Sequence, residues 1–129
     1  MDGRKWIINQ PWNKGPHIMS FGVSADGMDA ALSLLEPNED VSSGFYDITG
    51  GNLHHVAYPG GVLRSSLMFG WFSWFNESGW TERILEEANY YENSFYDMRS
   101  VDGKLTNKNT DFPAVFVGGW YDVMQEDTI

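Results

Sequence analysis

The chain of 129 residues is long enough for one small domain, and its 18 acidic against 8 basic residues give it a net charge of −10. Nucleic acid and anionic membrane surfaces need clustered Lys and Arg, so this balance argues against both as partners. The absence of cysteine excludes disulfides, thiolate metal ligands and a cysteine nucleophile, and no run approaches the roughly 20 apolar residues of a membrane span.

Helical and strand patterns alternate along the chain. In chain order they predict a helix at 4–9, a buried strand at 18–23, a helix at 26–35, a short strand at 45–49, helices at 62–74 and 81–92, and a strand at 114–117. Thr81 is expected to cap the last of these helices, with Ile84, Leu85, Ala88 and Tyr91 on one face. Residues 102–110 are polar and turn-like. Such alternation predicts an α/β fold with a parallel sheet.

The number of predicted strands is small for this class of fold. Only about three are visible, and a doubly wound sheet needs more, so we expect the chain to be the middle part of a larger domain. Residues of about 53–110 would then form a helical insertion over the carboxyl ends of the strands, where open α/β sheets bind their substrates.

A serine between small residues marks the first strand-to-helix turn. The run 21–27 reads Phe-Gly-Val-Ser-Ala-Asp-Gly, and an Ala/Leu-rich helical pattern follows at once. This is typical of a nucleophile elbow, with Ser24 as nucleophile and the Ala25 N–H facing a developing oxyanion. The usual pattern is G-x-S-x-G; here Asp26 holds the second glycine's position and Gly27 follows it. An ordinary strand–turn–helix connection would have the same pattern.

Three blocks of sequence extend this interpretation over nearly the whole chain. They are Gln-Pro-Trp-Asn-Lys-Gly at 10–15 with the strand at 17–24, Tyr-Pro-Gly-Gly-Val-Leu-Arg at 58–64, and the run 112–122, which ends in Gly-Gly-Trp-Tyr-Asp. In this order and spacing they resemble the X-Pro dipeptidyl-peptidase and cocaine-esterase family of serine hydrolases. The resemblance implies a partial α/β-hydrolase fold with core at 1–52, a helical cap insertion at 53–110 and a return to the core at 111–129.

The resemblance also implies the chemistry. Such enzymes transfer an acyl group to serine, and their triad follows the chain order Ser, acid, His. Ser24 matches the nucleophile and Asp122 the acid, whereas Asp47, Glu126 and Asp127 do not match the acid position. The base and the second oxyanion donor are expected outside the chain, the base after Asp122. Relatives often have a tyrosine after the nucleophile, so the contacts of that side chain are in doubt at Ala25.

The histidines of the chain all precede Asp122. His17 is expected at the wrong end of its strand for catalysis, and His54 and His55 open the predicted insertion, where one could line a pocket. The pair also hints at a metal, but no third ligand lies at a suitable spacing, so we expect no metal and no cofactor.

Aromatic residues make up 16% of the chain, which suits either a core or an apolar pocket. The candidate pocket walls are Tyr58, Trp71, Trp74 and Trp120. The expected substrate is a small ester or amide or a peptide. Peptidase, esterase and acylase activity, oligomeric state and location all stay open. Two alternatives remain: a catalytically inactive hydrolase-like binding module, and a small stand-alone α/β domain with coincidental motifs.

Overall fold

The computed structural model describes residues 3–76, 78–86, 93–106 and 110–128. Its elements are, in chain order, α1 (Gly3–Ile8), β1 (Ile18–Val23), α2 (Ser24–Ser33), β2 (Val41–Asp47), α3 (Leu53–Ala57), a 3₁₀ turn (Pro59–Gly61), α4 (Ser65–Trp74), α5 (Ser78–Glu86), α6 (Ser94–Asp97), β3 (Ala114–Val117) and α7 (Gln125–Thr128).

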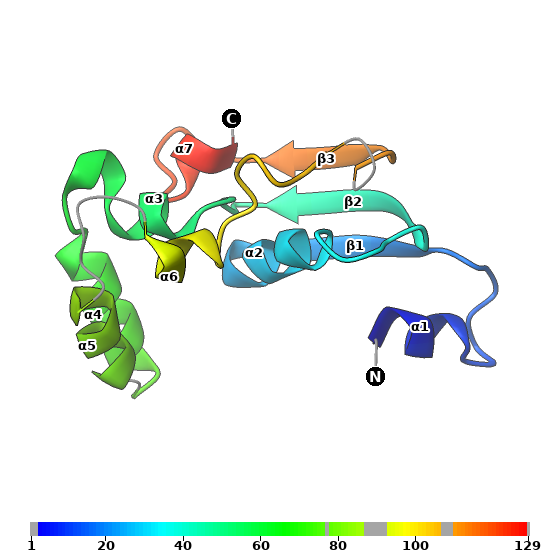
Figure 1. The fold of residues 1–129 in the computed structure, drawn as a ribbon, viewed down its shortest axis with the longest axis horizontal. Helices are drawn as coiled ribbons and strands as arrows, with labels where there is room; N and C mark the ends of the chain where they lie inside the picture. The colour runs from blue at the N-terminus through cyan, green and yellow to red at the C-terminus, as the bar shows by residue number, and fades with distance from the viewer. Residues whose placement is uncertain (1–2, 77, 87–92, 107–109, 129) are drawn as a thin grey trace.

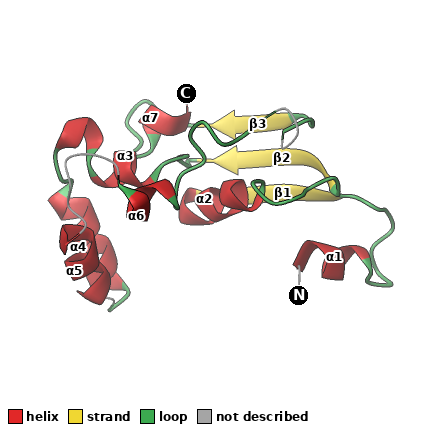
Figure 2. Ribbon diagram, in the orientation of Figure 1, coloured by secondary structure: helices red, strands yellow, loops and turns green. Residues whose placement is uncertain are grey.

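The strands of the described residues form one parallel sheet in the order β1-β2-β3 (Figure 1). Phe21 of β1 pairs with Phe45 of β2, which in turn pairs with Val115 of β3. Because β1 and β2 are parallel, the chain must cross over between them, and α2 makes this crossover on one face of the sheet (Figure 2). The predicted parallel α/β arrangement is therefore confirmed.

The two faces of the sheet differ in what covers them. On the face that α2 covers, Tyr46 is 1% exposed and packs with Leu34 and Val41. On the other face Met19 and Phe21 are 58% and 56% exposed. The prediction that 18–23 is a buried strand is therefore right about the strand and wrong about its burial, because neighbouring residues of a strand point to opposite faces and only one face is covered.

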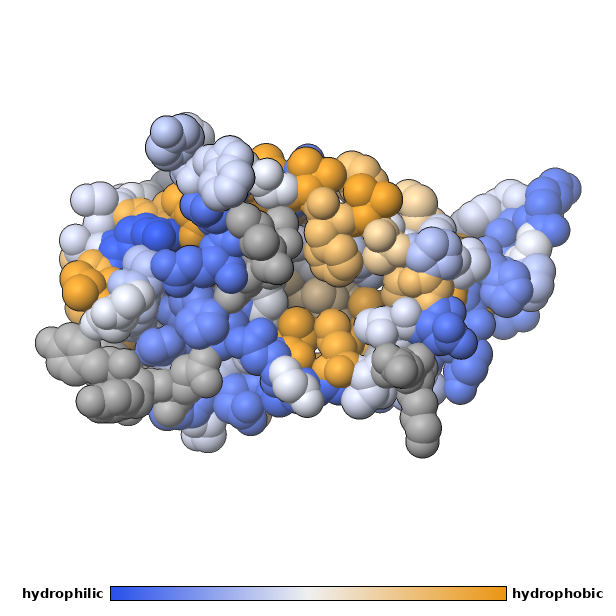
Figure 3. Space-filling view, turned by 90° about the horizontal axis from the view of Figure 1, so that it is seen from above, coloured by the Kyte–Doolittle hydropathy of each residue, from blue (hydrophilic) through white to orange (hydrophobic). Residues whose placement is uncertain are grey.

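The edge strand β3 is exposed along its whole length. Figure 3, which looks down on this edge of the sheet, shows apolar residues gathered in the middle of the face and a hydrophilic end at the right of the view. Val115, Phe116 and Val117 contribute to this exposed apolar surface.

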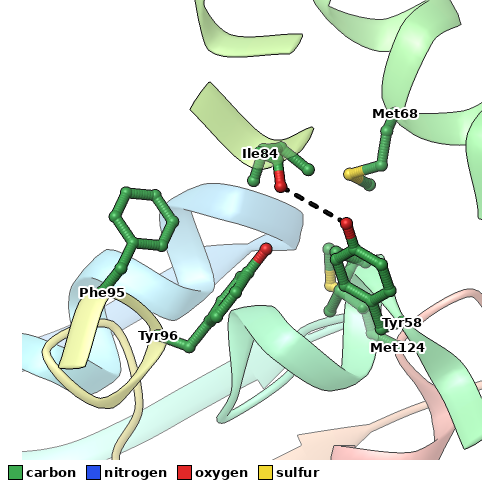
Figure 4. Packing of buried hydrophobic residues seen from close by; sticks show 8 residues of the cluster. Tyr58, Met68, Ile84, Phe95, Tyr96 and Met124 are labelled. Carbon is green, nitrogen blue, oxygen red and sulfur yellow. Dashed lines mark hydrogen bonds between the residues drawn. The ribbon is translucent and has the colours of Figure 1, made fainter. Parts of the chain in front are cut away.

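The helices that follow β2 gather beyond the carboxyl ends of the strands, at the side to which the strand arrows point in Figure 1. They share a hydrophobic cluster of their own, drawn in Figure 4. Its buried members are Val56, Ala57, Tyr58, Met68, Ile84, Phe95, Tyr96 and Met124. Within it the Tyr58 hydroxyl donates a hydrogen bond to the carbonyl of Ile84, at 3.3 Å. The core of this part of the chain is thus separate from the small cluster beneath the sheet.

Several predicted boundaries shift. Helix α2 begins two residues earlier than expected, and β2 begins at Val41 because that residue pairs with Ile18. Helix α4 begins only at Ser65, since Val62 is extended.

Helix α5 begins at Ser78, so Thr81 lies inside it and is not its cap. On its predicted apolar face Ile84 is 1% exposed but Leu85 is 45% exposed, because neighbouring residues of a helix point about 100° apart. The rest of that prediction, Ala88 and Tyr91, lies outside the described residues.

The short helices α3, α6 and α7 were not predicted, since one turn gives too little periodicity to detect. Local side chains mark two of them: the Asn52 side chain accepts from the His54 N–H at the start of α3, and Asn93 does the same for the Phe95 N–H at α6. None of the helices described is long and apolar enough to span a membrane.

Candidate active site

Ser24 stands at the turn between β1 and α2 with a left-handed backbone, at φ 55°. Val23 before it is still extended, and the helix begins at Ser24 itself. A positive φ is uncommon for a residue with a side chain and costs on the order of 1–3 kcal/mol. Such a strained turn from strand to helix is the backbone feature of a nucleophile elbow.

Two glycines allow the helix to approach the sheet at this turn. A Cβ on Gly22 would lie 2.4 Å from Cα of Gly27 and 2.5 Å from the carbonyl oxygen of Asp26. A Cβ on Gly27 would lie 2.5 Å from Oγ1 of Thr49. The second close approach therefore falls at position 27, which accounts for the departure from G-x-S-x-G at Asp26.

Thr49 also ties the turn to the residues after β2. Its hydroxyl donates a 2.9 Å hydrogen bond to the carbonyl of Ser24. This bond holds the Ser24 carbonyl and so restricts rotation of the backbone at Ser24. It therefore helps to fix the left-handed conformation.

The start of α2 offers N–H groups to an anion. The first N–H groups of a helix lack hydrogen-bond partners inside it. The N-cap residue of α2 is Val23, whose side chain accepts no hydrogen bond from them. Ala25 is exposed and follows Ser24 directly, so its N–H is available to an oxygen bound at the Ser24 hydroxyl. Asp26 lies in the same first turn, where the helix dipole favours its negative charge.

Asp122 lies after the carboxyl end of β3, the same edge of the parallel sheet at which Ser24 follows β1. It is half-buried, and its Oδ1 accepts a 2.7 Å hydrogen bond from the Met124 N–H. Its own N–H donates to the Gly119 carbonyl at 3.0 Å. The local turn therefore holds the carboxylate, with one oxygen engaged.

The less favoured acids are Asp47, which is half-buried at the end of β2, and Glu126, which is exposed; the side chain of Asp127 lies outside the described part of the chain.

The structure does not bring a histidine to Ser24. His17 precedes β1 while Ser24 follows it, which puts about 20 Å of extended chain between them. His54 is buried, with its ring stacked on Tyr58 at 5.5 Å and edge-on to Tyr96 at 5.0 Å, so it is part of the helical core. His55 is half-buried, its ring 6.2 Å from that of His54. Over the described part of the chain, no group of three His, Asp or Glu residues could hold a metal ion.

An apolar cavity of about 270 Å³ adjoins the elbow. Ala25 and Met28 of α2 form part of its wall, Trp71 of α4 another, and Val123 and Met124, directly after Asp122, a third. The cavity therefore lies between the two predicted catalytic segments and the helices that follow β2.

The predicted pocket residues are distributed unevenly. Trp71 lines the cavity. Tyr58 is buried in the helical core, with its hydroxyl on Ile84. Trp74 and Trp120 are 85% and 79% exposed and do not line this cavity, so a role for either in binding stays a prediction.

Sequence reasoning missed Met28 and Met124. A signal existed for Met28, which lies one helical turn after Ser24 and hence on the same side of α2. No comparable signal marked Met124.

Comparison of the chain with models of known protein families, with curated proteins and with solved structures found no match.

Proposed function

We propose that the protein is a serine hydrolase that cleaves acyl esters or amides through an acyl-enzyme, of the X-Pro dipeptidyl-peptidase and cocaine-esterase type. In this proposal the sheet is part of an α/β-hydrolase core, and residues 53–110 form a cap insertion over it. The observation that carries the proposal is the left-handed Ser24 at a strand-to-helix turn, packed through Gly22 and Gly27 beside an apolar cavity.

In the proposed reaction the Ser24 Oγ attacks the acyl carbon, and the alcohol or amine leaves. The Ala25 N–H stabilises the negative charge that develops on the acyl oxygen. Asp122 orients the histidine that takes the serine proton. In this proposal that histidine comes from outside the 129 residues. In the last step water attacks the acyl-enzyme and releases the acyl group as an acid.

The alternative is a hydrolase-like module that binds a ligand without turnover. It is favoured by one observation, that no histidine hydrogen-bonds to the Ser24 hydroxyl within the described residues. The two functions differ in whether Ser24 is activated as a nucleophile.

The proposal is tested on the complete natural protein with a fluorophosphonate, which reacts covalently with activated serines. We expect the label on the peptide that contains Ser24. We also expect Ser24→Ala to lower kcat for a p-nitrophenyl ester by on the order of 10⁴-fold or more. Ser33→Ala, at the exposed far end of the same helix, is the matched control. It should keep both the label on Ser24 and the kcat of the wild type. A folded protein whose Ser24 takes no label would favour the binding module.

A further inference from the structure

Arg99 lies where two cavities adjoin. It lines the apolar cavity beside the elbow, and it also lines a second cavity of about 480 Å³ next to α5 and α6. Trp80 is the other residue that both walls share. Neither wall includes an acidic residue of the described chain, although the sequence holds 18 of them. Among the described residues, the charged side chains in these walls are Arg99 in both cavities and Arg83 in the second one.

The fold uses only part of the hydrogen-bonding capacity of Arg99. One Nη donates to the Phe95 carbonyl at 2.8 Å, and the guanidinium lies over the Phe95 ring, 4.0 Å from its centroid. These contacts fix the side chain, but a guanidinium carries five N–H donors. Among the described residues no carboxylate pairs with it.

Arg83 provides the contrast. It approaches the same Phe95 ring, at 5.4 Å, but an ion pair with Glu86 engages its guanidinium at 3.9 Å. Of the two arginines on this ring, Arg99 is the one that reaches the cavity beside Ala25.

We infer that Arg99 selects substrates whose acyl group carries a carboxylate, an inference that rests on the proposed function. The apolar chain of the acyl group would fill the cavity next to Ala25, and its terminal carboxylate would pair with Arg99. A planar guanidinium binds a carboxylate through two parallel hydrogen bonds, and a half-buried cation is poorly screened by water. A neutral acyl group leaves the charge of Arg99 without a partner.

The substrate class is thus a monoester or monoamide of a dicarboxylic acid. In the reaction the bond from the acyl carbon to Ser24 Oγ forms as the alcohol or amine leaves, and water then releases the dicarboxylate. Arg99 forms and breaks no covalent bond in this reaction. Its role is to determine which acyl group binds.

The kinetic test uses the complete natural protein and two esters of equal size, mono-p-nitrophenyl glutarate and its terminal amide, p-nitrophenyl 4-carbamoylbutanoate. We expect the wild type to prefer the glutarate in kcat/KM by about tenfold to a hundredfold, the range for a hydrogen-bonded charge. Arg99→Gln should abolish this preference and Arg99→Lys should keep part of it. Arg83→Gln should leave the ratio as in the wild type. A wild type with equal kcat/KM for both esters overturns the inference, as does a folded Arg99→Gln protein that keeps the preference.

A binding measurement separates this inference from the proposed function. Calorimetry on the Ser24→Ala protein compares monomethyl glutarate with methyl 4-carbamoylbutanoate, and needs no turnover. If Ser24→Ala binds the glutarate more tightly while the wild-type protein hydrolyses neither ester, the role of Arg99 is supported and the proposed hydrolase activity is overturned. If the wild-type protein hydrolyses the esters but Ser24→Ala binds the two ligands equally, the inference about Arg99 is overturned and the proposed hydrolase activity stands. If Arg99→Gln fails to fold, as circular dichroism would reveal, the wild-type preference and the Arg99→Lys variant still decide.

Discussion

The most informative residue of the chain is Ser24, whose left-handed backbone is unfavourable for any side chain other than glycine's. The surrounding contacts hold it in place: Thr49 binds its carbonyl, and Gly22 and Gly27 let the helix start immediately. Replacing Ser24 by glycine would relieve the strain, but under the proposed function it would also remove the nucleophilic hydroxyl.

Tyr46 carries a prediction about pH. Burial raises the pKa of its hydroxyl above the usual value of 10.0, and the hydrogen bond that it donates to Ser20 opposes this only in part. A raised folded-state pKa means that the native state holds the proton more tightly than the unfolded chain does. The contribution of Tyr46 to stability is therefore complete below about pH 10, where the unfolded chain also keeps the proton, and is lost as the pH rises through the folded-state pKa.

Denaturant unfolding of the complete protein between about pH 8 and pH 11, a range that spans the ordinary pKa of tyrosine, measures this effect. Tyr46→Phe is the control, because it removes the titrating group and keeps the ring. We expect the free energy of unfolding of the wild type to fall relative to that of Tyr46→Phe above about pH 10, where an unburied tyrosine gives up its proton. A difference between the two proteins that stays constant with pH would contradict the assignment.

At the scale of elements, the contact between β1 and α2 positions the candidate site. The two elements meet without a linker, and their close approach needs glycine at position 22, where a Cβ would clash with the backbone of Gly27. Elsewhere on α2, Ala30 packs against the cluster beneath the sheet and Ala31 is buried.

Gly22→Ala tests this contact. The new methyl group would meet backbone atoms of α2, which cannot rotate away as a side chain could. We expect a loss of about 1–3 kcal/mol in the free energy of unfolding, the usual cost of overpacking, together with a loss of esterase activity as the elbow shifts. Chemical denaturation and ester turnover of the complete protein measure the two effects.

Gly70→Ala is the matched control. Gly70 lies inside α4 with no atom within 4 Å of an added Cβ, so alanine there should stabilise the helix by about 0.5–1 kcal/mol. Equal and small effects of the two substitutions would refute the role given to Gly22.

At the scale of the whole molecule, the described residues form two separate hydrophobic clusters and a sheet with one open face. The cluster of the helices and the smaller one beneath the sheet each bury a few large side chains. The opposite face of the sheet exposes Met19, Phe21 and Val115, and β3 is an edge strand with exposed apolar side chains. Such a surface favours pairing with other chains.

We therefore expect the isolated 129-residue chain to self-associate or to unfold without a sharp transition. Circular dichroism during heating and analytical ultracentrifugation measure the two properties. Phe21→Thr, on the open face, should reduce association, whereas Val62→Thr, 69% exposed but away from the sheet, should not. A monomer with a sharp, cooperative thermal transition would instead support a stand-alone domain.

The sequence by itself predicted the alternation of helices and strands, the parallel sheet and the turn at Ser24. These features are local: they depend on the period of apolar residues and on glycine near a turn, which can be read within about ten residues. Asp122 was predicted to follow β3, and it does, because a strand end is also a local feature.

The tertiary structure decided which faces are covered and which residues line the cavity. Phe21 and Tyr46 are both aromatic strand residues, yet one is exposed and the other buried, because α2 packs on only one face. Trp71 and Trp74 are three residues apart on α4, and only the first lines the cavity beside Ala25. Arg99 reaches that cavity from a segment 75 residues after Ser24 in the chain. Such contacts depend on how distant segments pack together, and no local pattern carries that information.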